Sequence, residues 1–325
     1  MAHKTLIDGT SYNVVSGTSM VSGATYNISS GNTLVDGTRY NINFGPKKTA
    51  MLYSDGSFVF QDGDDIAAGK SLTASYTDFE DTYSPPWNGK QQYFTSVDFN
   101  TEISPSLMYY WFYNASNMVA NISDFHNLNM SNVTSMRYTY EACSNLTGSP
   151  VCGDKVTNMC HTYFACYNLT GAPVCGSNVT DMASAYYSCS NLTGSPVCGD
   201  RVTSMYYTYG FCSNLTGSPV CGSNVIDMAY AYYYCCNLRS NAYFYSPKVS
   251  YIQSCFGGRN TSERLNIYVV ANSTTNTTIH YNNTSSLVGA NIIWTNAGTY
   301  QYNASYNIYI YPVENVAAAR AANGD

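Results

Sequence analysis

The sequence predicts a mainly β protein with short helices: a solenoid of 23-residue coils, preceded by 14-residue β-hairpin repeats and flanked by β caps. Three observations lead to this fold class. The first 45 residues repeat every 14 residues, the middle of the chain repeats every 23, and the composition is hydrophobic but poor in charge. A period of roughly 20–50 residues is typical of solenoids, in which each unit buries its apolar face against the next.

The composition narrows the class of protein. Charged residues make up 10% of the 325-residue chain, against roughly 25% in an ordinary soluble domain. Because 45% of the residues are hydrophobic and 15% aromatic, the chain is expected to fold rather than stay disordered. A formal net charge of −6, with no run of Lys or Arg, argues against a nucleic-acid partner, which would require a basic patch.

Targeting and membrane segments are not predicted. The segment from Met1 to Gly9 lacks the apolar region of a secretory signal peptide, so we expect synthesis in a host cytoplasm without export. No stretch approaches the length of a transmembrane helix, and we expect no membrane insertion.

Residues 1–45 are predicted to form an attachment module of β-hairpin repeats. Its three units run from Thr5 to Gly17, Thr18 to Gly31 and Asn32 to Gly45. Each reads as a short strand, an Asp-Gly or Ser-Gly turn and a second β-branched strand, the pattern of a tight hairpin. A lone hairpin is marginally stable, so these units need stacked neighbours or partner chains.

Residues 46–107 are predicted to form a linker and an N-terminal β cap. Gly45 and Pro46 indicate a linker. The segment from Met51 to Phe60 is predicted to be a hairpin whose turn is Asp55-Gly56. The segment Ser96 to Phe99 reads as the first strand of the coiled region. The exposed ends of a solenoid need such caps.

The solenoid is predicted over residues 108–258. We number positions in each unit from its methionine as zero; methionine, tyrosine at +4, cysteine at +7 and leucine at +10 recur every 23 residues. Stacked units place like residues on one another, so we expect a structural ladder in the core. Its members are Met136, Met159, Met182, Met205, Met228, Cys143, Cys166, Cys189, Cys212 and Cys235.

The invariant positions 0, +3, +4 and +7 have the spacing of one face of a helix, so each coil is predicted to contain a helical turn. An Asn such as Asn145 suits a left-handed helix end, and Pro-Val-Cys-Gly reads as a short strand. Positions +1, +2 and +5 vary and form the outward face. We predict that this face binds a ligand through Tyr138, His161, Phe164, Tyr187, Tyr206, Tyr207, Tyr230 and Tyr233.

The twelve cysteines admit three interpretations: disulfides, zinc ligands or free thiols. A chain without an export signal is a poor context for disulfides, and the repeat does not supply the paired Cys spacing of structural zinc sites. Buried free thiols are therefore favoured, since unpaired Cys behaves as a small hydrophobic residue. Whether Cys235, Cys236 and Cys255 form disulfides is left open.

Residues 259–325 are predicted to form a C-terminal β cap and tail. Leu265 to Val270 and Tyr306 to Tyr311 alternate as strands, and Ala317 to Ala322 reads as a short helix.

Two resemblances to known families rest on these residues. The blocks Asn132 to Met136 and Cys143 to Thr147, repeated through about residue 258, resemble the BspA-like leucine-rich repeats of bacterial surface proteins. That resemblance implies a leucine-rich-repeat-like solenoid, although Pro-Val-Cys stands where the family usually has Leu-x-Leu. The units from Thr5 to Gly45 resemble segments of tail-associated proteins of phages that infect Gram-positive bacteria.

Catalytic and metal-binding motifs are not found in the sequence. Phosphate-binding loops, nucleophile elbows and His-Glu-x-x-His are missing, and the four His are scattered. Asp62, Asp64 and Asp65 could bind calcium, but their spacing favours a solvated turn. We predict a protein that is not an enzyme and has neither a metal nor a cofactor.

We expect a phage virion protein, associated with a tail or fibre, that recognises the host surface through its aromatic face. Its partners would be a host cell-surface glycan or protein, and other virion proteins bound through residues 1–45. Rigid tyrosines suit adaptable recognition because they give a large contact area at low entropy cost. The alternatives are a structural fibre or decoration component that forms a homo-oligomer through the same face, and an adhesin on the bacterial cell surface.

Overall fold

The computed structural model describes residues 47–239, 241–258, 264–270 and 309–325, together with the backbone of the strands in the remaining segments. Within the first 45 residues, each 14-residue unit forms one antiparallel hairpin, as predicted. The three hairpins are β1 (His3–Ile7) with β2 (Thr10–Val14), β3 (Thr18–Val21) with β4 (Ala24–Asn27), and β5 (Thr33–Val35) with β6 (Thr38–Tyr40).

A four-stranded sheet precedes the coils. Its strands lie in the order β10-β8-β7-β9, and they are β7 (Lys48–Tyr53), β8 (Ser57–Asp62), β9 (Leu72–Tyr76) and β10 (Ser96–Phe99). The predicted hairpin on Asp55-Gly56 is present: Gly56 has φ +85°, and a Cβ there would lie 2.5 Å from the Tyr93 carbonyl oxygen. The 3-10 helix η1 (Gln91–Tyr93) leads into β10, which pairs in parallel with β8.

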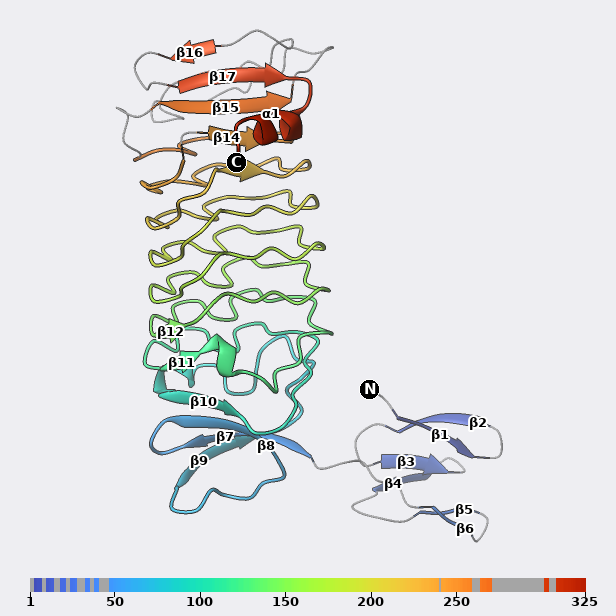
Figure 1. Cartoon of the computed structure of the whole chain (residues 1–325). Coiled ribbons are helices and arrows are strands. Elements are labelled where there is room, and N and C mark those ends of the chain that lie inside the picture. The colour runs from blue at the N-terminus through green and yellow to red at the C-terminus, as the bar shows by residue number, and fades with distance from the viewer. Residues whose placement is uncertain are drawn as a thin grey trace.

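Successive coils then stack in parallel along one axis (Figure 1). The residue just before each methionine forms a β-bridge with its equivalent in the next coil, through Ser135, Asn158, Asp181, Ser204, Asp227 and Tyr251. Regular strands are rare here: β11 (Ala120–Asn121) pairs with β12 (Leu146–Thr147), and the 3-10 helix η2 (Ile122–Asp124) follows β11.

The ladder residues line the interior of the stack. The five methionines and the five cysteines at +7 are all at most 3% exposed. The tyrosines at +4 stack on one another as near-parallel rings, with centroids 5.3 Å apart for Tyr140 and Tyr163 and 5.6 Å for Tyr186 and Tyr209. Each coil therefore covers the apolar face of its neighbours, which a single unit could not do for itself.

Polar groups inside the stack bond to backbone atoms. Thr162 Oγ1 donates to Met136 O (2.9 Å), and Cys166 Sγ donates to Tyr140 O (3.0 Å) in the preceding coil. The Tyr186 hydroxyl donates to Val174 O (2.7 Å) and accepts from Val174 N (3.1 Å). The cysteines thus serve as weak donors as well as small apolar residues.

The predicted helical turn in each coil is wrong. Among the described residues of 108–258, η2 is the only helix, and the segment after each methionine consists of turns. Positions +2 and +6 have positive φ, 58° at Tyr138 and 60° at Ala142, which a right-handed helix cannot contain. Their N–H groups instead donate to the next coil, as in the bonds from Tyr138 N to Cys160 O (3.1 Å) and from Ala142 N to Phe164 O (2.7 Å).

Two further local predictions are wrong. The left-handed residue stands at +6 and not at the later Asn: Asn145 uses its side chain to donate to Ser116 O (2.8 Å). Pro-Val-Cys contributes a strand only at β13 (Val220–Cys221). The N–H and C=O of this valine bond to a tyrosine hydroxyl in β13 as well as elsewhere, as at Val174 and Val220. The strand forms at β13 because Pro219 O and Cys221 O accept the N–H groups of Tyr243 and Tyr245.

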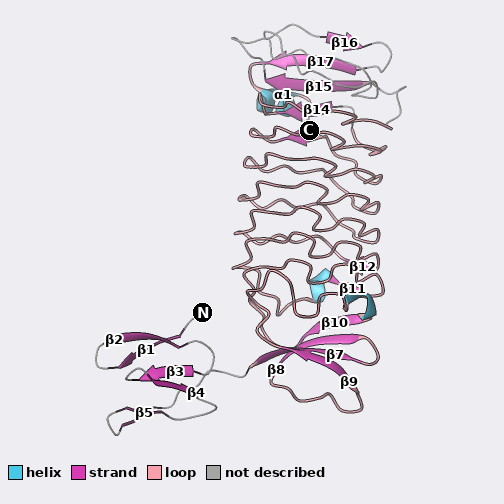
Figure 2. Ribbon diagram, turned by 180° about the vertical axis from the view of Figure 1, so that it is seen from behind, coloured by secondary structure: helices cyan, strands magenta, loops and turns pink. Residues whose placement is uncertain are grey.

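A five-stranded sheet follows the coils (Figures 1 and 2). Its order is β13-β14-β15-β17-β16, with the further strands β14 (Asn241–Phe244), β15 (Leu265–Val270), β16 (Gln301–Asn303) and β17 (Ile308–Val313). The predicted C-terminal strands and terminal helix are present, the helix being α1 (Val316–Ala322), capped by the Asn315 side chain. No helix in the described part of the chain has the length and apolar character needed to cross a membrane.

The segment after α1 is fixed to the end of the stack. The Asp325 carboxylate accepts hydrogen bonds from Tyr243 (2.6 Å) and Asn241 (2.9 Å) and pairs with Arg239 (2.6 Å). Burial alone would raise the pKa of Asp325, but these donors outweigh it and lower that pKa to about 2. The contact joins α1 to β14.

Candidate functional site

The turn geometry of each coil sorts its side chains into an inner and an outer set. Positions 0, +3, +4 and +7 point into the core, while the side chains at +1, +2, +5 and +6 lie on one face of the stack. This pattern of two inner and two outer residues follows from the left-handed residues at +2 and +6, after which the backbone turns back toward the core. The outer positions can therefore vary in sequence without disturbing the ladder.

The eight predicted binding residues are brought together in one continuous chain of ring contacts. Phe164 stacks on Tyr187 with centroids 4.7 Å apart, Tyr187 meets Tyr207 at 5.5 Å, and Tyr207 stacks on Tyr230 at 4.4 Å. We define the aromatic belt as twelve rings of this chain of contacts: Tyr110, Tyr113, Tyr138, His161, Phe164, Tyr187, Tyr206, Tyr207, Phe211, Tyr230, Tyr233 and Tyr234.

Four members of the belt were missed by sequence reasoning. Tyr110 and Tyr113 belong to a coil whose methionine, Met108, precedes Met136 by 28 residues and not 23, so the period did not align them. Phe211 and Tyr234 stand at +6, a position that the helical interpretation did not assign to the outer face. Asn114 and Ser188 at the same position are small or polar, which was a usable sign of an exposed turn.

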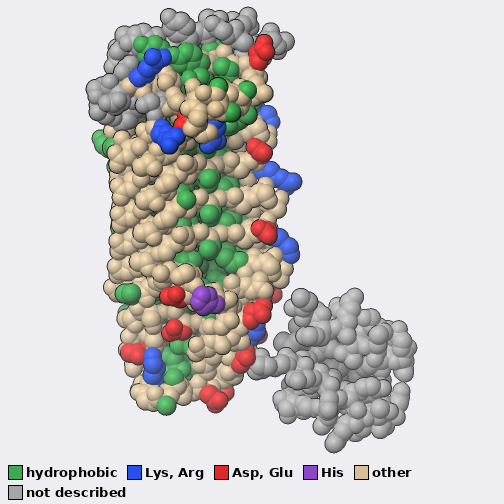
Figure 3. Space-filling model, viewed as in Figure 1, with side chains coloured by type: hydrophobic (Ala, Val, Ile, Leu, Met, Phe, Trp, Pro, Cys, Tyr) green, Lys and Arg blue, Asp and Glu red, His purple; other side chains and the backbone are tan. Residues whose placement is uncertain are grey.

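Most belt rings cover one another and are only half exposed. Of the eight predicted residues, Tyr206 is exposed (42%), and the other seven are half-buried. One face of the stack (Figure 3) carries apolar and aromatic side chains along its middle, with charged side chains mostly at its ends and along one edge. The belt is therefore a surface of mutually packed, mostly half-buried rings.

The backbone under the belt is held in an unfavourable conformation. Tyr138, His161, Tyr207 and Tyr230 all have φ between 53° and 58°. The left-handed region disfavours bulky residues, and Gly or Asn would fit these turns with less strain. An aromatic ring at such a position is retained at a cost in stability, which points to a use for the ring itself.

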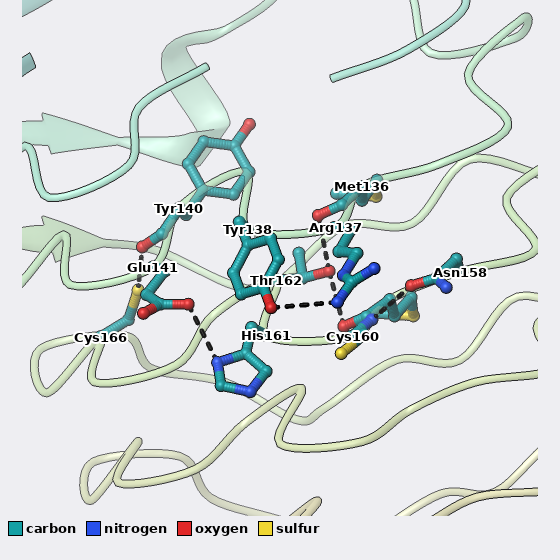
Figure 4. Close-up of polar contacts among 11 residues, drawn as sticks. Met136, Arg137, Tyr138, Tyr140, Glu141, Asn158, Cys160, His161, Thr162 and Cys166 are labelled. Carbon is teal, nitrogen blue, oxygen red and sulfur yellow. Dashed lines mark hydrogen bonds and ion pairs between the residues drawn. The ribbon is translucent and has the colours of Figure 1, made fainter. Parts of the chain in front are cut away.

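Polar side chains gather at the N-terminal end of the belt (Figure 4). Glu141 Oε2 and His161 Nδ1 lie 2.9 Å apart across two coils, and His161 stacks on Phe164. The Arg137 guanidinium lies over the Tyr138 ring and donates to its hydroxyl (3.1 Å). This end of the belt offers a carboxylate, an imidazole and a guanidinium to a ligand, whereas the C-terminal end offers phenols.

Burial changes the acid–base behaviour of the phenols. Burial, followed by the neighbouring Tyr230 and Tyr206, raises the pKa of Tyr207 to about 12, and burial also raises the pKa of Tyr206 and of Tyr233. These phenols stay protonated at neutral pH. Each can donate one hydrogen bond to a ligand.

The cysteines of the described residues are free thiols. Cys235 joins the ladder through its bond to Tyr209 O (2.8 Å), Cys255 is buried, and Cys236 is exposed. Burial raises the pKa of Cys166 and Cys212 well above the ordinary value, so these thiols are not reactive thiolates. Within the described segments, no group of three or more His, Cys, Asp or Glu side chains could hold a metal ion, and this includes Asp62, Asp64 and Asp65.

Comparison of the chain with protein-family models, curated proteins and solved structures finds no match.

Proposed function

We propose that the protein is a non-enzymatic binding protein that attaches to a cell surface through the aromatic belt, carried on a leucine-rich-repeat-like solenoid. The observation that carries the proposal is the unbroken belt of rings, built from side chains that the core ladder does not need. Monomeric proteins rarely expose a contiguous apolar patch without a partner for it. The positive φ under Tyr207 and Tyr230 adds support, because these rings are kept in spite of backbone strain.

The proposed setting is a phage virion. The resemblance of residues 1–45 to segments of phage tail proteins, and their three consecutive hairpins, support a module that docks to other virion proteins. The belt would then meet a glycan or protein of the host. An adhesin on a bacterial surface is the alternative location for the same face.

A second candidate function is self-association through the belt into a homo-oligomeric fibre or decoration component. Ring stacking favours it: the ring planes of Tyr207 and Tyr230 are 1° from parallel, so each covers one face of the other. Edges of aromatic rings pack well against the faces of other rings. A sister subunit could supply such rings.

One pair of substitutions tests the proposal. Tyr207→Asn with Tyr230→Asn removes two rings and leaves residues that tolerate positive φ. We expect attachment of the purified protein to Gram-positive cells to weaken by about 2–4 kcal/mol, the range of a small hot spot. The unfolding free energy should change by less than about 2 kcal/mol, because the lost ring stacking is worth about 0.5–1.5 kcal/mol.

The matched control is Tyr167→Asn, which removes a ring that is 49% exposed and lies outside the belt. Attachment should be unchanged in this variant. Wild-type attachment by the double variant would refute surface binding through the belt. If the double variant instead converts an oligomer to a monomer in sedimentation, the self-association function is the correct one.

A further inference from the structure

We propose that the corner formed by Tyr206, Tyr207, Tyr230 and Asp227 is a binding site for an organic ammonium group. The inference deepens the proposed function and rests on it, since it names the chemical class that this part of the aromatic belt takes from a surface ligand. The ammonium group could be quaternary, as in choline, or a primary amine, as in an amino sugar or a lysine side chain.

The Tyr206 ring is perpendicular to two stacked rings. Tyr207 and Tyr230 are parallel, and the Tyr206 ring stands at 90° to the first and 89° to the second, with centroids 4.8 Å and 6.3 Å away. The faces of aromatic rings carry partial negative charge and attract cations. Because Tyr207 and Tyr230 each cover one face of the other, a cation would meet the perpendicular Tyr206 ring, which is 42% exposed, and the ring faces that the stacking leaves uncovered.

A carboxylate without a counter-ion lies beside these rings. Asp227 is half-buried, and one of its oxygens accepts the Ala229 N–H (2.8 Å). Among the described residues it forms no ion pair with Lys, Arg or His. Asp227 forms a β-bridge with Ser204, and its carbonyl oxygen accepts the N–H of Met205 (2.7 Å), the residue before Tyr206. Burial raises the pKa of Asp227, and burial, then Tyr230 and then Asp227, raises the pKa of Tyr206. A cation bound at the rings would supply the missing positive charge.

This part of the belt contains no competing cation. The segments 181–188, 204–211 and 227–234, which form the outer face of three coils, have neither Lys nor Arg. The single Arg of the belt region, Arg137, lies at the other end, where its guanidinium covers the Tyr138 ring. The C-terminal half of the belt is thus electron-rich and negatively charged, which complements a cationic ligand and not an anionic one.

The repeat provides an internal comparison. Asp181 stands at the same position two coils earlier, and its side chain accepts Ala183 N–H (2.9 Å) in the same way. Cys160 takes the place of Tyr206 there, and Ser184 takes the place of Tyr230. Asp181 therefore has the carboxylate without the three tyrosine rings. Asn also fits this position, because Asn158 accepts the Cys160 N–H (2.9 Å).

The test is a titration of the full-length protein, followed by calorimetry and by the NMR signals of the tyrosine rings. The ligands are choline, methylammonium and 3,3-dimethylbutan-1-ol, which is an uncharged analogue of choline. We expect saturable binding of at least one of the two ammonium ions and none of the alcohol. The ion that binds more tightly, choline or methylammonium, shows whether the site prefers a quaternary or a primary ammonium group.

Asp227→Asn should weaken ammonium binding by about tenfold or more, a change of about 1.4 kcal/mol. Tyr206→Ala should abolish it, whereas Asp181→Asn and Tyr167→Ala should leave it unchanged. Equal losses in Asp227→Asn and Asp181→Asn, equal binding of the alcohol, or no binding of either ammonium ion would overturn the inference. Those results would leave belt-dependent attachment to cells intact. Wild-type attachment by the double variant Tyr207→Asn with Tyr230→Asn would instead refute the proposed function, and ammonium binding by the wild-type protein would still show the ammonium site.

Discussion

Individual side chains in this protein are fixed by the backbone atoms that they face. Threonine recurs at +3 and cysteine at +7 because each donates to a carbonyl oxygen of the preceding coil, as Thr208 Oγ1 does to Met182 O (2.8 Å) and Cys212 Sγ to Tyr186 O (2.9 Å). A buried carbonyl without a donor would cost free energy. The repeat therefore predicted which residue types form the ladder, but it did not predict the hydrogen bonds that favour threonine and cysteine at these positions.

The thiols provide a direct test of this burial. Most of the twelve cysteines should react with a thiol reagent only after denaturation, because burial keeps them protonated and out of reach. Cys236, which is exposed, should react in the native protein. Labelling should be measured by intact mass with and without a reductant. Cysteines that react only after reduction would show disulfides in place of free thiols.

A buried charge tests the assignment of inner and outer positions. Met182 is fully buried, whereas its neighbour Ala183 is half-buried on the outer face. Met182→Asp should destabilise the protein by several kcal/mol, because it places an unpaired carboxylate in an apolar core. Ala183→Asp should leave the fold intact. Melting curves of the two variants give the comparison, and equal losses would contradict the assignment.

The backbone of a single coil explains why the predicted helical turn at positions 0 to +7 is wrong. The spacing 0, +3, +4, +7 marks residues that share one side, and a helix is only one way to place them there. In this chain two left-handed residues at +2 and +6 bend the backbone so that the same four positions turn inward. Nothing in the spacing distinguishes these turns from a helix, because the deciding bonds run to the next coil.

The tyrosine at +4 links two parts of a coil, and a pair of substitutions measures that link. Tyr186→Phe removes the hydroxyl that serves both Val174 N and Val174 O, so it should cost about 1–3 kcal/mol of unfolding free energy. The Tyr140 hydroxyl is buried and has no partner within the described residues. Tyr140→Phe should therefore be neutral or stabilising in the same denaturant titration. A larger loss in Tyr140→Phe than in Tyr186→Phe would contradict this account.

Across the whole molecule, the periodicity predicted more than the local patterns did. The hairpins, the strands at both ends, the terminal helix and the buried positions follow from repeats and alternation in the sequence. The ring contacts between Tyr207 and Tyr230 also follow, because stacking brings equivalent positions together. The corner at Asp227 could not be predicted, since it depends on ring angles and on a charge whose neighbours lie in other coils.

The stack as a whole should be sensitive to alkaline pH. Burial raises the pKa of the five ladder thiols, Cys143, Cys166, Cys189, Cys212 and Cys235, while an unfolded cysteine titrates at about 8.5. Below that pH the thiols are protonated in both states and contribute no pH dependence. Above it the unfolded chain loses protons that the folded chain retains, so the unfolded state binds fewer protons and stability falls as pH rises.

Each fully buried thiol should then lower the unfolding free energy by about 1.4 kcal/mol per pH unit above about pH 8.5, until its folded pKa is reached. The buried tyrosines, such as Tyr186, whose pKa burial also raises, should add to this slope above about pH 10. Urea unfolding between pH 7 and 10.5 measures the effect. Cys189→Ala should reduce the slope of unfolding free energy against pH by the contribution of one thiol, about 1.4 kcal/mol per pH unit. An unfolding free energy that stays constant to pH 10.5 would show that the ladder thiols are not held protonated in the folded core.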